Sequence, residues 1–344
     1  MKITLAIDLM GGDKAPKSTI EGIKIAIEQN PNVHFICFGS HSVIQKAKKN
    51  LKTRCEFIES NEDISADDKV SIAVRKKESS MSLAIKSTQD GKSHATVSSG
   101  NTGALMSLSK LYFRTIEGIT RPAICTVIPT VESHSVLLDM GANIECSPQN
   151  FLEFGIMGSA FLKSAFKMSD PKVGILNIGT EESKGNQLVQ DAYALFQKSS
   201  IAKNFTGFIE GDTLHNGKTN VIVTDGFTGN IVLKTMEGSG KTMKYFLKKY
   251  ITGSILGKFA VMLAFPCFKK IHQKIDPNRY NGAMFLGLNG ITVKSHGSSN
   301  AKGFANAINV AYNLVEAGIN EHLSNEIRII HKQEDTIQIQ NEQN

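Results

Sequence analysis

The fold is most directly predicted by the segment Ala95–Leu108, which reads ATVSSGNTGALMSL. A short β-rich run ends at Ser98-Ser99-Gly100, and from Asn101 the apolar residues recur at the 3.6-residue period of a helix. The turn glycine lets the backbone come close to a ligand, and the first N–H groups of the helix carry partial positive charge. This strand–turn–helix segment therefore predicts a site where an anion binds.

The same arrangement recurs three times in the second half of the chain. Strands predicted at Val173–Asn177, Val221–Thr224 and Ile291–Lys294 each lead into a turn rich in Gly, Ser, Thr or Asn, and then into a helix. In open α/β sheets, ligands bind outside the carboxyl ends of the strands. We therefore expect an α/β fold with a mostly parallel sheet and flanking helices, and one anion-binding crevice formed by these four strand-to-helix corners.

Length and composition indicate an ordinary globular protein. At 344 residues, with 41% hydrophobic and 21% charged residues, the chain is long enough for a large sheet with an added subdomain. We predict a single large α/β domain over residues 1–335, with a helical insertion at about residues 240–280, and a polar, frayed tail at residues 336–344. Five cysteines without CxxC spacing indicate reduced thiols and a cytoplasmic protein.

The excess of Lys and Arg over Asp and Glu, 39 against 32, gives the chain a net charge of +7. Such an excess either serves solubility or indicates an acidic partner, such as nucleic acid, anionic lipid or an acidic carrier protein. A helix expected from Asn230 places Lys234, Lys241, Lys244 and Lys248 on one side. That side is either a solvated basic face or a docking face for an acidic protein.

Several familiar motifs are missing or misplaced. The run Gly238-Ser239-Gly240-Lys241-Thr242 resembles the end of a phosphate-binding P-loop, but it lies within the expected helix and lacks the first glycine. No G-x-G-x-x-G follows a strand, no H-E-x-x-H is present, and the nine histidines are scattered. We therefore expect neither a nicotinamide cofactor nor a bound metal.

The segment Ile251–Phe268, ITGSILGKFAVMLAFPCF, is apolar and has two lysines on either side. It is too short to cross a membrane, which takes about 20 apolar residues, and Pro266 predicts a kinked or paired helix. Cations beside an apolar stretch are typical of a segment that lies in a membrane interface. An interface between two copies of the chain explains the pattern equally well, and the two are compatible. We expect a projecting helical pair.

Among single residues, His296 is the strongest candidate for proton transfer. It lies between a strand and a helix, next to Gly297-Ser298-Ser299, and Lys294 two residues earlier points to the same side of the strand. A histidine that only caps the following helix would explain the same position. Lys184 follows two glutamates, so either a catalytic role or a salt bridge in solvent accounts for it.

Seven runs distributed along the chain carry a family resemblance. They are IDLMGGDKAPK, SSGNTGALM, RPAICTVIPT, LLDMGANIECSP, PKVGILNIGTEESKGNQLV, IVTDGFTGNIVLKTMEG and GAMFLGLNGITVKSHGSSNAKG. By these runs, from Ile7 to Gly303, the chain resembles the phosphate acyltransferases of bacterial phospholipid synthesis, which make acyl phosphate from acyl-carrier protein and phosphate. That family is similar in fold to the isocitrate and isopropylmalate dehydrogenases. Two positions depart from its pattern, because Lys14 stands where the family commonly has His, and Thr213 where Asp is usual.

The resemblance implies a transferase that needs no cofactor. Its implied partners are acyl-carrier protein, inorganic phosphate and a downstream membrane acyltransferase that uses the acyl phosphate. We also expect a cytoplasmic homodimer that is peripherally associated with the membrane through residues 251–268 and has no nucleic-acid partner.

On this identification, the corner residues receive specific roles. We expect catalysis by His296, Lys294, Lys184 and Asn230. The residues expected to bind phosphate or the acyl thioester are Asn101, Thr102, Gly103, Asn177, Asn186, Asp225, Ser298 and Ser299. Those expected to dock the carrier protein are Lys241, Lys244 and Lys248.

The chemistry of the expected reaction matches these corners. Phosphate is already an anionic nucleophile, so the site must hold it near the thioester carbonyl, stabilise an oxyanion and release a thiolate. The alternatives are an oxidative decarboxylase of the same fold and a non-enzymatic scaffold. The first needs clustered acidic metal ligands and arginines, but Arg114, Arg121 and Arg279 are not grouped in one loop. The second would leave the polar corners without a role.

Overall fold

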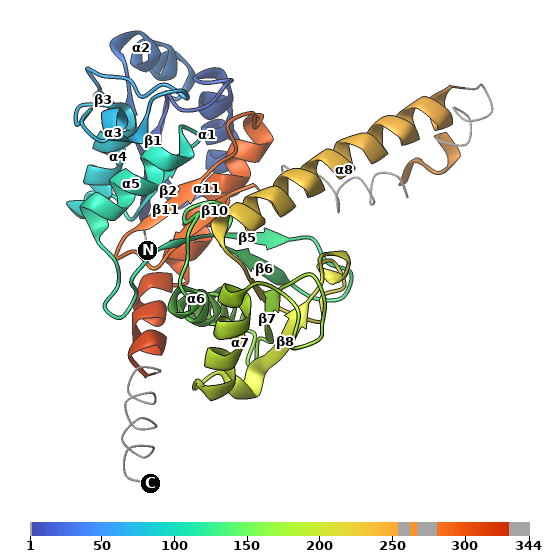
Figure 1. Ribbon diagram of the computed structural model, residues 1–344. Helices are drawn as coiled ribbons and strands as arrows, with labels where there is room; N and C mark the ends of the chain where they lie inside the picture. The colour runs from blue at the N-terminus through green and yellow to red at the C-terminus, as the bar shows by residue number, and fades with distance from the viewer. Residues whose placement is uncertain (1, 254–261, 267–280, 330–344) are drawn as a thin grey trace.

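The computed structural model describes residues 2–253, 262–266 and 281–329 (Figure 1). Within these residues, eleven strands form one sheet in the order β3-β2-β1-β4-β11-β10-β5-β6-β9-β7-β8. The strands are β1 (Ile3–Asp8), β2 (Val33–Gly39), β3 (Cys55–Glu59), β4 (Ala95–Ser98), β5 (Ala123–Ile128), β6 (Ser135–Leu138), β7 (Val173–Leu176), β8 (Phe205–Ile209), β9 (Val221–Val223), β10 (Ala283–Leu286) and β11 (Ile291–Lys294).

Helices cover the sheet between these strands (Figure 1). They are α1 (Lys17–Gln29), α2 (His41–Asn50), α3 (Val70–Ala73), α4 (Ser80–Gln89), α5 (Thr102–Phe113), α6 (Pro148–Phe166), α7 (Gln187–Lys198), α8 (Gly226–Thr252) and α11 (Ala301–Glu316). Most strand pairings are parallel, which confirms the predicted α/β class. No helix in the described part of the chain is long and apolar enough to cross a bilayer.

The two halves of the sheet run in opposite directions. Strand β10 is antiparallel to both of its neighbours, β11 and β5, and β6 is antiparallel to β5. The parallel group that contains β4 and β11 therefore points one way, and the group that contains β6, β9 and β7 points the other way. Two of the four predicted corners, after β4 and β11, therefore follow strands of one direction, and the two after β7 and β9 follow strands of the other.

The register of the pairing nevertheless brings the carboxyl ends of the two halves together. Lys294, at the end of β11, pairs with Ala283 at the start of β10. The next residue of β10, Met284, pairs with Cys125 in the middle of β5. The residue after Cys125, Thr126, pairs with Leu137 near the end of β6. The ends of β11 and β6 therefore lie at the same level of the sheet, with β10 and β5 between them, although the two strands run in opposite directions.

Helix α6 is buried along most of its length, as its apolar sequence predicts. Phe151 and Phe154 have no exposed surface, and Ser147 and Asn150 form a reciprocal capping box at the start of the helix. The predicted reduced thiols are also confirmed for the described cysteines. Cys37, Cys55, Cys125 and Cys146 are free, whereas Cys267 lies outside the described residues.

Helix α8 begins earlier than predicted. It starts at Gly226, not at Asn230, because Asp225 caps it by accepting a hydrogen bond of 2.8 Å from the N–H of Thr228. The sequence did not predict this first turn as helical, because it contains two glycines and glycine is a weak helix former. The first turns of α8 pack on the sheet, and the P-loop-like run lies inside the helix, as predicted.

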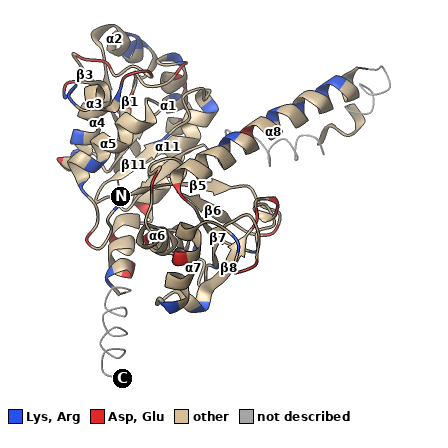
Figure 2. Ribbon diagram, in the orientation of Figure 1, with Lys and Arg blue, Asp and Glu red and all other residues tan. Residues whose placement is uncertain are grey.

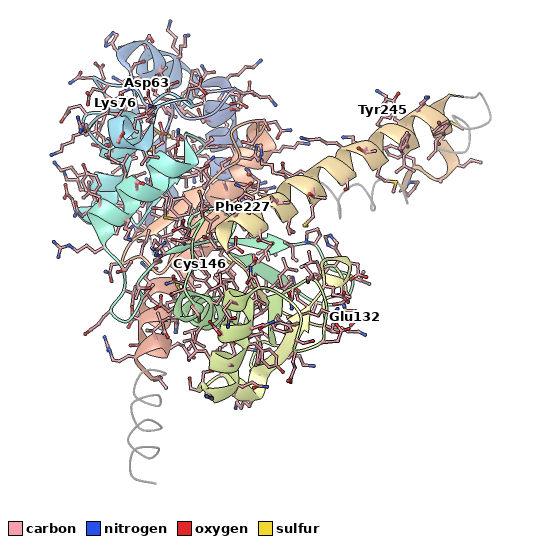
Figure 3. All side chains as sticks on the ribbon, viewed as in Figure 1. Asp63, Lys76, Glu132, Cys146, Phe227 and Tyr245 are labelled. Atoms are coloured by element: carbon pink, nitrogen blue, oxygen red, sulfur yellow. The ribbon has the colours of Figure 1, made fainter. Side chains whose placement is uncertain are left out.

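Beyond Glu237, α8 projects away from the rest of the molecule as an arm (Figure 1). Every residue from Gly238 to Tyr250 is exposed. Figure 3 shows the two ends of this helix, with Phe227 at its base and Tyr245 on the projecting part. The predicted helical pair at residues 251–268 lies largely outside the described residues, and the polar tail at residues 336–344 lies wholly outside them.

Gly229 is required where α8 meets the loop after β6. A Cβ atom at this position would lie 1.9 Å from the carbonyl oxygen of Asp139, whereas a Cβ at Gly238 of the same helix meets no atom within 4 Å. We predict that Gly229→Ala lowers the free energy of unfolding by about 1–3 kcal/mol or more, as overpacking does. Gly238→Ala should raise it by roughly 0.5–1 kcal/mol, because alanine favours the helix.

Equilibrium unfolding in urea measures both changes. The two substitutions are chemically identical and lie on one helix. If they change the free energy of unfolding in opposite directions, the difference is due to the close approach of Gly229 to Asp139. Equal effects of the two substitutions would contradict the predicted clash.

Candidate active site

The corner after β11 is held by Asn281, a buried residue far from it in sequence. The side-chain Nδ2 of Asn281 donates hydrogen bonds to Ser295 Oγ (2.8 Å) and to the carbonyl of Gly303 (2.7 Å). Its Oδ1 accepts a hydrogen bond of 2.8 Å from the N–H of His296. Ser299 Oγ lies 3.0 Å from Ser295 Oγ in the same buried network. Asn281, which was not predicted from the sequence, orders the backbone that presents His296.

The ring of His296 is bonded through its Nδ1 atom. Nδ1 accepts a hydrogen bond of 3.1 Å from the backbone N–H of Ser298, and Ser298 Oγ lies 2.9 Å from the same nitrogen. The other ring nitrogen, Nε2, lies 3.5 Å from Oε1 of Glu237 on α8. The ring is therefore contacted from its own loop on one side and from α8 on the other.

Burial and charge both act on the His296 imidazole. Burial is the main cause that lowers the pKa of His296 below its ordinary value. The carboxylate of Glu237 opposes this shift, and the ammonium groups of Lys234, Lys294 and Lys241 add to it. The imidazole is therefore predominantly neutral near pH 7, and it can donate one hydrogen bond.

Lys294 lies buried beside this histidine. Its side chain is 9% exposed, and Nζ donates a hydrogen bond to the carbonyl of Ser295. Burial lowers the pKa of Lys294 to about 8, although the charges of Asp8 and Asp13 oppose this shift. A cation that is costly to bury lies where the sequence predicts that an anion binds.

The corners after β1 and β4 pack directly against the His296 loop. Asp8, at the end of β1, accepts hydrogen bonds from Ser98 Oγ (2.6 Å) and from the N–H of Met10 (3.0 Å). The N–H of Asp13 donates to the carbonyl of Gly297 at 2.9 Å. Three loops from adjacent parallel strands therefore form one wall of the site.

Lys14, one of the two departures from the family pattern, belongs to this wall. Its Nζ donates a hydrogen bond of 2.9 Å to the carbonyl of Ser298. Thr213, the other departure, lies in a short exposed turn, where its hydroxyl donates to the carbonyl of Glu210 at 2.9 Å. Only the Lys14 position therefore contacts the loop that carries His296.

All four corner helices begin with a side chain that caps the helix. The capping oxygens belong to Asn101 on α5, Asn186 on α7, Asp225 on α8 and Asn300 on α11. Three of these are residues for which we expected substrate contacts. Each cap occupies one N–H of the first turn. At α5, no described residue accepts a hydrogen bond from the N–H of Thr102 or Gly103.

The corner after β7 brings two predicted residues together. Asn177 Nδ2 donates a hydrogen bond of 3.1 Å to the carbonyl of Lys184, and a Cβ at Gly185 would collide with the Asn177 side chain. Lys184 is exposed and makes no ion pair within the described residues. Among the described residues, no hydrogen bond or ion pair joins this corner to His296.

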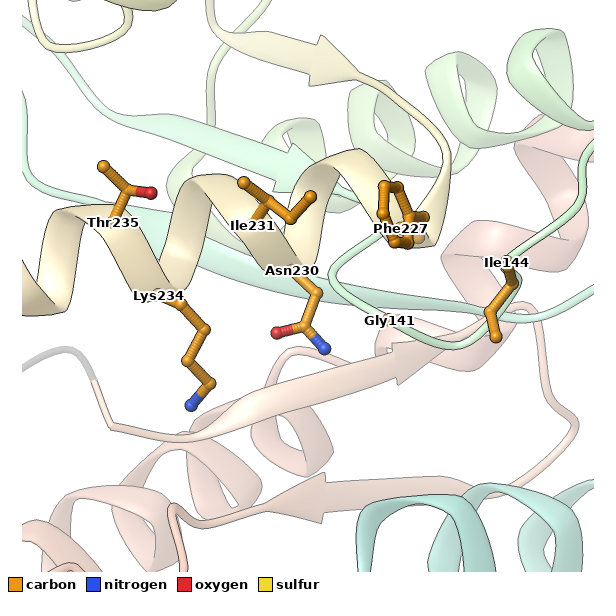
Figure 4. Close-up of a pocket in the computed structure, with 8 residues that line it drawn as sticks. Gly141, Ile144, Phe227, Asn230, Ile231, Lys234 and Thr235 are labelled. Carbon is orange, nitrogen blue, oxygen red and sulfur yellow. The ribbon is translucent and has the colours of Figure 1, made fainter.

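A cavity of about 530 Å³ opens at the base of α8 (Figure 4). Of its polar side chains, Asn230 and Lys234 extend from one side of the helix and Thr235 from the other (Figure 4). Three apolar residues of its lining, Ile144, Phe227 and Ile231, are at least half exposed. The complete lining is Gly141, Ile144, Gly226, Phe227, Asn230, Ile231, Lys234 and Thr235.

The cavity and the His296 corner are joined by a chain of charges. Lys234 Nζ, at the edge of the cavity, lies 3.5 Å from Oε2 of Glu237, and the second oxygen of that carboxylate faces His296. Helix α8 therefore bridges the corner after β9 and the corner after β11. Among the described residues, no group of three His, Cys, Asp or Glu is arranged to hold a metal ion.

Comparison with proteins of known structure gives the same fold. The chain aligns with a phosphotransacetylase from Streptococcus pyogenes with a TM-score of 0.57 at 15% identity, covering 92% of this chain and 94% of that one. A branched-chain phosphotransacylase from Enterococcus faecalis aligns with a TM-score of 0.54 at 14% identity, covering 91% and 99%. At these identities the likeness establishes the fold alone.

Sequence comparison establishes the family. A family model described as "Fatty acid synthesis protein" matches residues 3–322. The chain is 44% identical over 329 residues to a phosphate acyltransferase from Rhodospirillum rubrum, covering 94% of each protein. It is also 44% identical to one from Ehrlichia chaffeensis, covering 94% of this chain and 99% of that one. The protein is therefore an acyltransferase. It belongs to the phosphate acyltransferase family.

Proposed function

We propose that this enzyme transfers a fatty acyl group from acyl-carrier protein to inorganic phosphate. The product, acyl phosphate, supplies phosphatidic acid synthesis through a downstream membrane acyltransferase. The observation that carries the proposal is buried Lys294 beside His296, which is linked through Glu237 to Lys234 in the lining of a cavity with apolar side chains. A cation and a hydrogen-bond donor suit phosphate and a developing oxyanion, and apolar walls suit an acyl chain.

The proposed step balances without a cofactor. A phosphate oxygen attacks the carbonyl carbon of the thioester, the carbon–oxygen bond forms, and the carbon–sulfur bond then breaks to release the carrier thiolate. Phosphate would be held by the charge of Lys294 and by N–H groups such as those of Thr102 and Gly103. The thiolate needs little help in leaving, because a free thiol has a pKa of about 8.5.

Positioning and oxyanion stabilisation would supply most of the rate. Holding two reactants in a productive geometry contributes up to ~7–11 kcal/mol in favourable systems. One preorganised donor to an oxyanion contributes ~2.7–4 kcal/mol. We assign the donors to the carbonyl oxygen to neutral His296 and the amide of Asn230, because Asn230 lines the cavity and His296 is linked through Glu237 to Lys234 of the same lining. We propose that Lys184 also takes part in catalysis and that Asn177 and Asn186 bind substrate.

The reaction itself is the first test of this proposal. Purified protein, incubated with the acyl thioester of acyl-carrier protein and with phosphate, should form acyl phosphate without added metal or nicotinamide. Hydroxylamine traps the acyl phosphate as a hydroxamate. Lys294→Met should lower kcat by about 10²–10³, the cost of losing one preorganised charge. The matched control is Lys302→Met, because Lys302 is exposed on α11. Reduction of NAD with a hydroxy acid, or no phosphate-dependent product, would contradict the proposal.

The arm offers a docking surface for the acidic carrier protein. Lys241, Lys244 and Lys248 lie on its projecting part, and Figure 2 shows basic residues at intervals along that part of α8. Charges at an exposed surface act mainly by steering an oppositely charged partner, and salt screens them. These properties support a contact with the carrier and not with the acyl group.

Charge reversal tests this docking surface. Changing Lys241, Lys244 and Lys248 to Glu should raise the apparent KM for acyl-carrier protein roughly tenfold or more and weaken its dependence on salt. Turnover of an acyl thioester on a small thiol should be much less affected, because only Lys241 of the three acts on the pKa of His296. The matched control reverses Lys46, Lys48 and Lys49 on α2, which are also exposed. Equal loss with the small thioester would show that the arm does not dock the carrier.

The far end of the arm carries exposed apolar side chains. Met262, Leu263 and Phe265 are each more than half exposed, as is Tyr250 at the end of the described helix. Such a group of side chains is typical of a contact with a membrane or with another protein. We propose that this tip touches the surface of anionic bilayers and lies near the axis of a homodimer.

Vesicle flotation separates these contacts. Leu263→Glu with Phe265→Glu should weaken binding to anionic vesicles more than about 100-fold, since each apolar side chain contributes ~1.5–3 kcal/mol when buried. Soluble turnover should be largely unchanged. The control is Ile178→Glu, because Ile178 is 82% exposed but lies away from the arm. If the double variant still floats, the membrane contact lies elsewhere, and if it becomes monomeric, the tip belongs to the dimer interface.

A further inference from the structure

Glu237 occupies the point where the arm leaves the body of the protein. Its side chain is 21% exposed, whereas every residue from Gly238 to Tyr250 is exposed. Each carboxylate oxygen has its own partner, because Oε2 lies 3.5 Å from Lys234 Nζ and Oε1 lies 3.5 Å from His296 Nε2. Glu237 is therefore the last residue of α8 before the exposed arm, and it faces the histidine of the site.

The bonding of His296 determines which ring nitrogen carries the proton. The backbone N–H of Ser298 can only donate, so His296 Nδ1 must accept and cannot itself carry a hydrogen in this arrangement. In the neutral ring the proton is then on Nε2, the nitrogen that faces the Glu237 carboxylate. Ser298 selects the tautomer, and Glu237 faces the only ring N–H that can reach a substrate.

We propose that Glu237 is a positioning residue that fixes the orientation of the His296 ring, since its carboxylate faces the Nε2–H from which a bound carbonyl oxygen would then accept a hydrogen bond. Its carboxylate holds the imidazole against the base of α8 while Asn281 and Ser298 hold the loop on the other side. The kinetic part of this inference rests on the proposed acyl transfer, but the state of the imidazole can be measured without any substrate.

The charges around His296 predict how a substitution alters its titration. Lys234 and Lys241 approach from α8 and Lys294 from β11, and all three lower the pKa of His296. The loop after β1 contributes Asp13 beside Gly297 and Lys14 on Ser298. Glu237 is the acidic group that raises the pKa of His296. Removing its charge while keeping its shape should therefore lower that pKa further.

The decisive variant is Glu237→Gln, measured in the full chain. We expect the imidazole of His296, followed by NMR, to titrate at lower pH than in the wild type. We expect kcat to fall by about tenfold, less than the ~10²–10³ lost when an oxyanion donor itself is removed, because Glu237 acts through His296. The KM for acyl-carrier protein should be unchanged, in contrast to the arm lysine variants. The matched control is Glu326→Gln, which removes a carboxylate paired with Lys163 at 2.8 Å on another surface.

Three outcomes would overturn the inference. These are an unchanged kcat, an unchanged His296 titration, and a rise in KM alone. If Glu237→Gln does not fold, the second variant is Glu237→Asp, which keeps the charge on a shorter side chain. Glu237→Asp should lower kcat with a smaller change in the pH at which His296 titrates. An unaltered kcat would again overturn the inference. Absence of acyl phosphate formation by the wild type would refute the proposed function, but the NMR titration would still test the contact of Glu237 with His296.

Discussion

Strand β5 is the element on which the geometry of the site depends, because both halves of the sheet pair with it. Its first residues pair with β10 and its last residues with β6, and both pairings are antiparallel. The two parallel groups therefore run in opposite directions, and the ends of β11 and β6 lie at the same level of the sheet, with β10 and β5 between them. Helix α8 begins at that level, which is why a residue of α8, Glu237, reaches a histidine that follows β11 in the other half.

A buried carboxylate stabilises the loop that follows the strand in each half. Asp8 accepts hydrogen bonds from Met10, Gly11, Ser80 and Ser98, and Asp139 accepts them from Ile124, Gly141, Ala142 and Asn143. Burying a carboxylate is costly unless several donors surround it. Burial raises the pKa of Asp139, and the backbone donors act against that rise. The same carboxylate that folds the loop thus shapes the surface against which Gly229 packs.

Much of this architecture could be predicted from the sequence, because strong apolar patterns define β1, α6 and the four corners. Strands β3 and β8 could not, since they lie at the two edges of the sheet and are only partly buried. The opposed directions of the two halves depend on pairings between distant segments, which periodicity does not encode. For the same reason, Asn281 and Glu237 were missed, although each contacts the predicted His296.

The capped helices make the charge of Lys294 more important than the corner sequences suggest. Each cap occupies an N–H that an anion would otherwise use, so the helix starts alone offer few donors. Lys294 is buried, and burial lowers its pKa to about 8, so its ammonium form is present at neutral pH at a cost in desolvation. An anion bound beside it would offset that cost and raise the pKa again. In the proposed reaction, phosphate binding and the protonation of Lys294 would therefore strengthen each other.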